Sequence, residues 1–258
     1  LSAVSPVNLI EVKDLTIKFD EFVAVNSASF LVNQGETLGL VGESGSGKTT
    51  LGRALLKLVK PSSGSIHFNG QDITNLKESA LRPLRLSMQL IFQDPYSSLN
   101  PRMTIGSAIA EPLKVHKDLS AKERRERVAR LLDQVGLEAG HYHRYPHEFS
   151  GGQRQRIVIA RALALEPSFI VCDESVSALD VSIQAQVLKL LNDLKSKFGF
   201  TVIFISHDLA VVHYMSDRIM VMNKGRIVEV GDAEKVYRQP DSAYTQKLIN
   251  SIPTGIRV

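Results

Sequence analysis

Residues 42–50, GESGSGKTT, constrain the fold of this chain more than any other segment. They fit the pattern G-x-x-x-x-G-K-[ST], in which glycines let the backbone curl so that successive N–H groups point at phosphates. A strand-like apolar segment, 37–41, precedes them, and a helical pattern, 49–59, follows. Strand, glycine-rich loop and helix are the context that such a loop requires, and they disfavour a merely flexible Gly-Ser turn. The sequence therefore predicts a nucleotide-phosphate site in an α/β fold.

The hydrophobic pattern alternates between strands and helices along the chain. Strand patterns occur at 10–12, 15–19, 28–32, 37–41, 169–173 and 201–206, with hairpins near 65–70 and 218–230. Helical periodicity occurs at 105–114, 121–135, 153–164, 182–198 and 233–249, and 94–103 is rich in turn residues. This alternation predicts a mostly parallel sheet covered on its faces, with the helical block at 94–165 forming a lateral subdomain.

Composition and charge exclude several classes of protein. The 258 residues carry 31 Lys and Arg against 27 Asp and Glu, and the net charge of +4 is spread along the chain, which disfavours nucleic-acid binding. The single cysteine, Cys172, excludes a disulfide framework within the chain. No apolar stretch approaches the roughly 18–20 residues of a transmembrane helix, and the first residues lack a signal-peptide pattern. We therefore expect a cytoplasmic protein that reaches a membrane only through a partner.

Four residues carry the chemistry that ATP hydrolysis needs. Lys48 is placed to reach the β- and γ-phosphates, and the Thr49 hydroxyl is placed to bind Mg²⁺. Asp173 ends an apolar strand, where its carboxylate can face the metal, and Glu174 is our candidate for polarising the attacking water. An acidic helix N-terminus is the alternative for these two carboxylates. We expect the whole loop to bind the nucleotide: Gly42, Glu43, Ser44, Gly45, Ser46, Gly47, Lys48, Thr49 and Thr50.

Two further phrases, FSGGQ at 149–153 and FIVCDES at 169–175, follow the loop in a fixed order. Together the three phrases resemble the signature of ABC-type ATPases, and the resemblance covers nearly the whole chain. It implies a P-loop (RecA-like) α/β core with an N-terminal antiparallel β subdomain and an inserted α-helical subdomain. On this basis we expect one domain over residues 1–258. Its core lies at 1–93 and 165–235, its helical subdomain at 94–164, and its C-terminal helix and tail at 236–258.

The resemblance also implies roles for individual residues. Gln93 matches the glutamine that touches Mg²⁺ or the water, residues 177–180 with Asp180 match the D-loop, and His207 matches the histidine that holds the γ-phosphate. The resemblance places the following four residues against the γ-phosphate of an opposite subunit, which implies a dimer: Ser150, Gly151, Gly152 and Gln153. The catalytic set is then Lys48, Gln93, Glu174 and His207, and the metal set is Thr49, Gln93 and Asp173.

Some assignments stay open at this stage. The family usually stacks an aromatic side chain on adenine; Phe19 is our first choice and Phe22 the second, a core phenylalanine being the alternative. Phe149 replaces the commoner leucine before the signature, and we expect it to serve as an equivalent apolar anchor. The histidines of HYHRYPH, 141–147, could suggest a metal site, but the absence of nearby cysteines and the single adjacent carboxylate disfavour one.

Several segments resemble the oligopeptide/dipeptide importer branch: residues 92–103, 145–150, 174–182 and 242–245. The resemblance implies an ATPase with ATP and Mg²⁺ as cofactors, peripheral to the cytoplasmic face of the inner membrane. Its partners would be a second ATPase subunit, identical or paralogous, a membrane permease, and indirectly an extracytoplasmic solute-binding protein. The chain stops at Val258 without the proline- and cysteine-rich tail of many members. The alternative is a soluble ABC ATPase that acts on DNA or ribosomes, and a non-hydrolysing domain is disfavoured.

The segment after Gln93 is the expected contact with a permease. Tyr96, Leu99 and Met103 are apolar side chains in a turn-rich stretch, and we expect them to be exposed there. Packing within the helical subdomain is the alternative.

Overall fold

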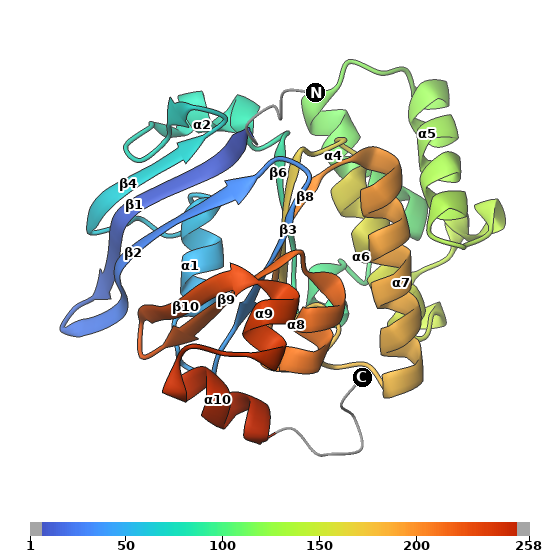
Figure 1. Ribbon diagram of the computed structural model, residues 1–258. Coiled ribbons are helices and arrows are strands. Elements are labelled where there is room, and N and C mark those ends of the chain that lie inside the picture. Colours follow the sequence, from blue (N-terminus) through green and yellow to red (C-terminus); the bar gives the residue numbers. More distant parts are fainter. Residues whose placement is uncertain (1–6, 252–258) are drawn as a thin grey trace, which may run out of the picture. The chain divides into compact units, whose positions relative to one another are not determined.

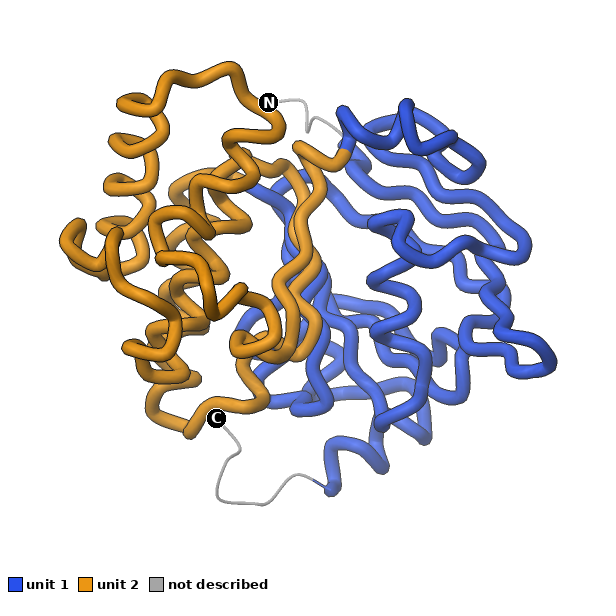
Figure 2. The backbone as a smooth tube through the Cα atoms, turned by 180° about the vertical axis from the view of Figure 1, so that it is seen from behind, with its two compact units in different colours: residues 1–84, 200–258 blue, residues 85–199 orange. Residues whose placement is uncertain are grey.

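The computed structural model describes residues 7–251, and these form two compact units (Figure 2). Unit 1 contains the chain up to Leu84 together with the chain from Phe200 onward, and unit 2 contains Arg85–Gly199. The division into a core and a helical subdomain at 94–164 stays a prediction. Each unit is described by itself.

Unit 1 contains an antiparallel sheet with the strand order β2-β1-β4-β5 (Figure 1). Its strands are β1 (Asn8–Phe19), β2 (Phe22–Asn33), β4 (Ser63–Phe68) and β5 (Gln71–Asp72). Buried and exposed side chains roughly alternate along β1 and β2, as expected of a sheet with one buried face. Phe19 pairs with Phe22 at the end of the β1–β2 hairpin. This hairpin therefore carries both candidates for the adenine contact.

The other strands of unit 1 run in the order β10-β9-β3-β8. β3 (Thr37–Val41) is parallel to β8 (Thr201–Ser206) and to β9 (Arg218–Asn223), and β10 (Arg226–Asp232) is antiparallel to β9. Every residue of β3 and β8 is buried, which explains why their sequences are continuously apolar rather than alternating. The phosphate loop directly follows β3, so the most buried strands of the unit fix its position.

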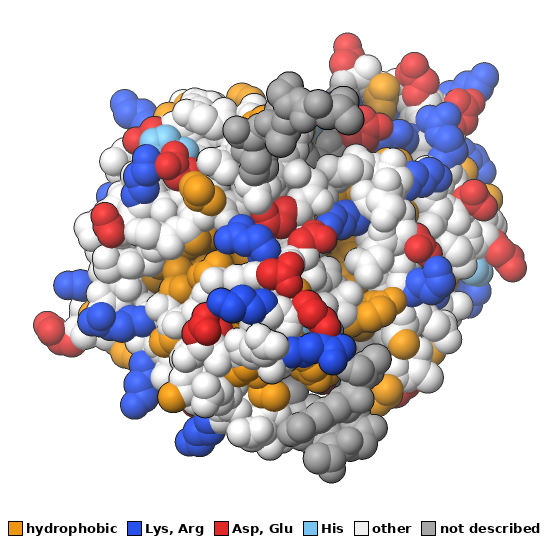
Figure 3. Space-filling view, viewed as in Figure 1, with side chains coloured by type: hydrophobic (Ala, Val, Ile, Leu, Met, Phe, Trp, Pro, Cys, Tyr) orange, Lys and Arg blue, Asp and Glu red, His pale blue; other side chains and the backbone are white. Residues whose placement is uncertain are grey.

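Helices of unit 1 pack on these strands. α1 (Lys48–Leu55) contacts β2 and β8, whereas α8 (Leu209–Met215) contacts β3 and β8. Gly39 permits the approach of α8, because an added Cβ would lie 2.3 Å from atoms of Val212 and Ser216. The remaining helices of unit 1 are α2 (Glu78–Leu84), α9 (Ala233–Arg238) and α10 (Ala243–Asn250). α9 carries both acidic and basic side chains, whereas α8 carries no Asp, Glu, Lys or Arg; red and blue side chains are interspersed in the middle of the view in Figure 3.

Unit 2 pairs β6 (Met88–Ile91) in parallel with β7 (Phe169–Asp173). Its helices are α3 (Pro95–Ser98), α4 (Ile105–His116), α5 (Ala121–Gln134), α6 (Gly151–Leu163) and α7 (Val181–Phe198), with short 3₁₀ turns η1 (Ala139–His143) and η2 (Pro146–Glu148). α6 contacts α3, α4, α5, α7 and β6, so it is the central element of this unit. Nine of its residues are buried, including the polar Arg154 and Gln155.

Several helix ends differ from the sequence-based expectation, each for a local reason. α1 ends at Leu55 and not near residue 59, and Lys57 just beyond it takes a left-handed φ of 57°. The helix expected over 233–249 is two helices, because the chain breaks near Pro240, which lacks a backbone N–H. The turn-rich stretch after Gln93 contains α3, whose Asp94 cap accepts hydrogen bonds from the N–H groups of Tyr96 and Ser97.

The expected exposure of the three apolar side chains near α3 is wrong for Leu99. Leu99 is 2% exposed and packs in the core of unit 2, whereas Tyr96 is 65% exposed. Met103 has intermediate burial. No helix among residues 7–251 is long and apolar enough to cross a membrane.

Candidate nucleotide-binding site

The phosphate loop of unit 1 encloses its own lysine. Lys48 is 4% exposed, and its Nζ donates to Gly42 O at 2.7 Å, to Glu43 O at 2.9 Å and to Ser46 Oγ at 3.4 Å. The Ser46 N–H closes a turn onto Glu43 O at 3.2 Å. The ammonium group is therefore held inside the curl of the loop. The sequence predicts that phosphates bind at this position.

Two glycines of the loop are required by close backbone contacts. Gly42 has φ 156°, and an added Cβ would lie 2.1 Å from Met222 O on β9. Gly47 has φ 102°, and an added Cβ would lie 2.2 Å from Ala24 O on β2. The N–H of Gly225, in the β9–β10 turn, donates to Ser46 O at 3.0 Å. By contrast, nothing lies within 4 Å of a Cβ built on Gly45. The loop is thus supported on one side by β2 and the β9–β10 hairpin and is open at Gly45.

The loop leads directly into the N-terminus of α1. Gly47 is the N-cap and supplies no side-chain hydrogen bond to the first turn. The N–H groups at a helix start favour anions, both as donors and through the helix dipole. A glycine-rich loop, a buried lysine and this helix start are what a polyphosphate needs, so the residues present fit ATP.

The carboxylates of unit 2 lie at the end of a fully buried strand. β7 ends at Asp173, which is itself buried, and Glu174 follows with a left-handed φ of 49°. Such a backbone conformation is unfavourable for a non-glycine residue and clusters at functional sites. Burial raises the pKa of the neighbouring Cys172 thiol to about 12, so this cysteine is unreactive at neutral pH.

A hydrogen-bonded group joins three of the predicted residues in unit 2. Gln93 Nε2 donates to Glu174 Oε2 at 3.0 Å and to Ser177 Oγ at 3.4 Å. Ser177 Oγ in turn donates to Glu174 O at 2.9 Å. The predicted glutamine, the predicted base and the segment 177–180 therefore meet, and the Gln93 amide oxygen is not used by these bonds.

The proposed metal residues have the right chemistry for Mg²⁺. A hydroxyl from Thr49, a carboxylate from Asp173 and an amide oxygen from Gln93 are hard oxygen donors. Mg²⁺ usually takes one or two carboxylates together with substrate phosphates rather than a protein cage. Residues 7–251 contain no group of three or more His, Cys, Asp or Glu side chains placed to hold a metal. Thr49 belongs to unit 1, and Asp173 and Gln93 belong to unit 2.

The signature residues form the start of α6. Ser150 is the N-cap: its Oγ accepts from the Gln153 N–H at 3.3 Å, and Gln153 Oε1 accepts from the Ser150 N–H at 3.0 Å. Gly152 allows α7 to approach, since an added Cβ would lie 2.3 Å from Ile183 Cγ2. Phe149 is buried, with its ring 5.1 Å from the ring of His141. Ser150 itself is exposed, so the start of this helix is accessible to a partner.

The other predicted residues occupy helix and strand ends. Asp180 caps α7 by accepting from the Ile183 N–H at 3.0 Å and from Ser182 Oγ at 2.8 Å, and the first of these bonds lowers the pKa of its carboxyl. Phe19, on the β1–β2 hairpin, is 48% exposed. His207 is exposed and follows β8 directly. Unit 1 therefore holds the loop, Phe19 and His207, and unit 2 holds Gln93, the signature, both carboxylates and Asp180.

One contact at the loop was not predicted. The N–H of Glu43 donates to the hydroxyl of Tyr244 at 3.2 Å, across 201 positions of sequence. Tyr244 lies on α10, in the SAYT segment 242–245, one of the segments that resemble the importer branch. Such a contact has no signal in the sequence beyond a polar aromatic side chain near the end of the chain.

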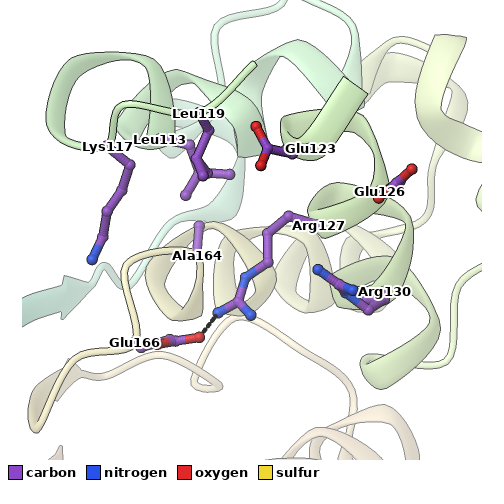
Figure 4. A pocket seen from close by; sticks show the side chains of 9 residues that line it. All are labelled: Leu113, Lys117, Leu119, Glu123, Glu126, Arg127, Arg130, Ala164 and Glu166. Carbon is purple, nitrogen blue, oxygen red and sulfur yellow. Dashed lines mark hydrogen bonds and ion pairs between the residues drawn. The ribbon is translucent and has the colours of Figure 1, made fainter. Parts of the chain in front are cut away.

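Unit 2 also contains a pocket of about 290 Å³ away from these residues (Figure 4). Its floor is apolar, with Leu113 and Ala164, and Arg127 pairs with Glu166 across it. Glu123, at its rim, is engaged in capping α5 through Ser120. Arg127, Glu166 and Glu123 therefore already interact with other groups of unit 2.

Comparisons with known proteins agree with this geometry. The model of the family described as ABC transporter matches residues 25–177. The chain is 56% identical over 232 residues to the glutathione import ATP-binding protein GsiA of Pectobacterium atrosepticum, covering 90% of this chain and 37% of that protein. It is 53% identical over 251 residues to the oligopeptide transport ATP-binding protein OppF of Streptococcus mutans, covering 95% of this chain and 82% of that protein. The chain thus spans well under half the length of the glutathione relatives.

Solved structures show the same fold. CbiO1 of Clostridium perfringens, part of the ABC transporter complex CbiONQ, has a TM-score of 0.83 and 29% identity, covering 90% of this chain and 91% of that chain. The dimeric ATP-binding cassette MJ0796 bound to ADP and phosphate has a TM-score of 0.78 and 29% identity, covering 87% and 98%. The predicted α/β P-loop fold with an antiparallel β part is confirmed.

Proposed function

Because the chain belongs to the ABC transporter family, we propose that it is the ATP-hydrolysing subunit of an importer for peptides or related small solutes. The observation that carries the proposal is the complete set of hydrolysis residues in a chain that covers 82% of an oligopeptide transport ATP-binding protein at 53% identity. The relatives compared above are named as import ATPases, and nothing favours a soluble ATPase that acts on DNA or ribosomes.

The residues divide the chemistry between the two units. The loop amides, Lys48 and the start of α1 bind the phosphates, and Phe19 stacks on the adenine. Thr49, Asp173 and Gln93 would hold Mg²⁺, which would supply positive charge against the phosphates. Glu174 orients the attacking water and accepts its proton, and His207 holds the γ-phosphate. The Gln93–Glu174 hydrogen bond helps to keep the base in place, because Gln93 Nε2 donates to Glu174 Oε2 at 3.0 Å.

A second ATPase subunit, identical or paralogous, completes each site in this proposal. The accessible start of α6, with Ser150 to Gln153, presents its N–H groups to the γ-phosphate bound by the opposite subunit. Closure of the two subunits around ATP then moves a membrane permease, which receives solute from an extracytoplasmic binding protein. The location that follows is peripheral, on the cytoplasmic face of the inner membrane.

Tyr96 is the side chain we assign to the permease contact. It is 65% exposed, and the buried Arg154 guanidinium supports its ring from beneath, with Cζ 3.9 Å from the ring centroid. Arg154 is itself fixed by Nε donating to Pro146 O at 2.7 Å. The phenol is therefore held at the surface rather than free to rotate. Because Leu99 is buried, it takes no part in this contact.

Two substitutions test the hydrolysis assignment. Lys48→Ala removes the charge that pairs with phosphates, so binding of MgATP should be lost. Glu174→Gln keeps the shape of the side chain but not its basicity, so MgATP should bind and persist while turnover falls. Light scattering of Glu174→Gln with MgATP tests pairing of subunits. Turnover of Glu174→Gln at the wild-type rate would contradict the role of Glu174.

The importer assignment has its own test. Co-expression with the permease encoded by neighbouring genes should yield a membrane complex whose ATPase rate rises with a loaded solute-binding protein. Co-purification with ribosomes or DNA, and no stimulation in that complex, would support the soluble alternative instead.

A further inference from the structure

We propose that Tyr244 on the C-terminal helix α10 is a positioning residue of the phosphate loop, holding the Gly42–Glu43 peptide in the conformation that binds nucleotide. The proposal rests on the proposed function, because it assumes that this loop binds phosphates. It gives a physical role to the SAYT segment, 242–245, which the function described above does not use.

A single peptide unit of the loop is held at both of its polar ends. Its carbonyl, Gly42 O, accepts from Lys48 Nζ at 2.7 Å, and its N–H, that of Glu43, donates to the Tyr244 hydroxyl at 3.2 Å. Gly42 has no room for a side chain, because an added Cβ would lie 2.1 Å from Met222 O. A residue with more restricted backbone dihedral angles therefore cannot take its place and hold the peptide. The orientation of this peptide therefore depends on the two side chains.

The two contacts differ in what happens when nucleotide binds. Lys48 must turn at least part of its hydrogen bonding from loop carbonyls to phosphate, which weakens its hold on Gly42 O. The Tyr244 contact is at the opposite polar end of the peptide, at the Glu43 N–H, so a shift of Lys48 toward phosphate leaves it in place. Tyr244 is then the side chain that keeps this peptide oriented in both conditions.

The position of Tyr244 is itself fixed by a strand that supports the loop. The Glu229 carboxylate, on β10, accepts from the N–H of Asp241 at 2.8 Å and from that of Ser242 at 3.1 Å. Ser242 Oγ then caps α10 by accepting from the Tyr244 N–H at 3.2 Å. Glu229 pairs with Val221 on β9, one residue before the Met222 that backs Gly42.

These contacts form one connected set within unit 1. The β9–β10 hairpin contacts the phosphate loop directly through Met222 and Gly225. The same hairpin also holds the loop indirectly, because Glu229 anchors α10 and α10 carries Tyr244. Thr245, next to Tyr244, is fully buried, so α10 is packed against its unit and is not a loose appendage. A preformed loop binds more tightly because less conformational entropy is lost on binding.

The test uses Tyr244→Phe, which removes only the hydroxyl group, in the otherwise intact chain. The matched control is Tyr214→Phe, because Tyr214 lies in the same unit, is 60% exposed and has a side chain that makes no hydrogen bond within residues 7–251. Binding of MgADP to Tyr244→Phe should weaken about three- to tenfold, the range of one ordinary hydrogen bond, with Tyr214→Phe unchanged. Turnover at saturating ATP should change much less than the KM, because no group on the reacting atoms is altered.

Hydrogen exchange without nucleotide gives a second readout. The segment that contains the Glu43 amide should exchange faster in Tyr244→Phe, while β3 exchanges at the wild-type rate. Glu229→Gln should act in the same direction as Tyr244→Phe, because it weakens the anchor of α10 without touching the loop. If Tyr244→Phe binds MgADP as the wild type does and leaves this exchange unchanged, the proposal is wrong.

Two other outcomes are separated by the same measurements. A lower melting temperature with unchanged exchange and unchanged MgADP affinity would assign Tyr244 to stability alone and overturn the proposal. If the wild-type chain binds no nucleotide, the proposed function fails, and the exchange of the Glu43 segment still decides whether Tyr244 orders the loop.

Discussion

Ser150 has two roles in the account above, and a matched pair of capping boxes in unit 2 separates them. Its Oγ caps α6 at 3.3 Å from the Gln153 N–H, and it is also assigned to the γ-phosphate of an opposite subunit. Ser120 makes the same box at the start of α5, with Oγ 3.2 Å from the Glu123 N–H, and has no assigned role in hydrolysis. Both serines are exposed. Ser150→Ala and Ser120→Ala therefore remove the same local bond from two different places.

The expected magnitudes follow from the bonds that each variant loses. An N-cap is worth about 1 kcal/mol, so each variant should lower the melting temperature by about 2–4 °C in a chain of this size. Ser150→Ala should additionally lose a hydrogen bond to a charged phosphate, worth about 1.5–3 kcal/mol. That loss corresponds to a fall of about ten- to a hundredfold in the hydrolysis rate of the assembled dimer.

The assay is ATP turnover measured beside a thermal denaturation curve for the wild type and both variants. Ser120→Ala should lose stability and keep its turnover, and Ser150→Ala should lose both. If the two variants lose stability alike and hydrolyse ATP alike, Ser150 is only a helix cap. The assignment of the signature to a γ-phosphate would then be refuted for this residue.

Three more predictions rest on burial and charge. Tyr96→Glu should keep basal ATPase activity, because Glu can still pair with Arg154, but should lose co-purification with the permease. Leu99→Asp should instead lower the free energy of unfolding by at least about 3 kcal/mol, because Leu99 is buried. If both variants keep wild-type stability and lose permease binding equally, this distinction between the two residues is wrong. Cys172 should resist a maleimide at pH 7.5 in the folded protein and react in denaturant, because burial raises its pKa to about 12; rapid labelling of the native chain would contradict that burial. The hydrogen bond from Ser120 lowers the pKa of Glu123, so this carboxylate should stabilise the fold above the ordinary Glu pKa and lose that effect as the pH falls through the lowered pKa. The difference in melting temperature between the wild type and Glu123→Gln should therefore become smaller in acid. A difference that stays constant with pH would refute this prediction.

The local pattern of the sequence was enough to predict the elements that carry the motifs. The strands at 37–41, 169–173 and 201–206 coincide with β3, β7 and β8, because fully buried strands need continuous apolar side chains. The loop at 42–50 was predictable for the same kind of reason: its glycines, its lysine and its place between strand and helix are all properties of neighbouring residues. The capping boxes at Ser120 and Ser150 are also local, since a serine and an acceptor three residues later suffice.

The tertiary structure decided the contacts between distant parts of the chain. Leu99 is buried and Tyr96 is exposed, although the two are three residues apart in one turn-rich stretch, because the tertiary packing of unit 2 covers one and not the other. The Gln93–Glu174 bond spans 81 positions, and the Tyr244–Glu43 bond spans 201. Periodicity and capping arise from interactions between residues a few positions apart and can be recognised in sequence. A hydrogen bond between distant residues depends on where the whole fold places both partners, and no local pattern records it.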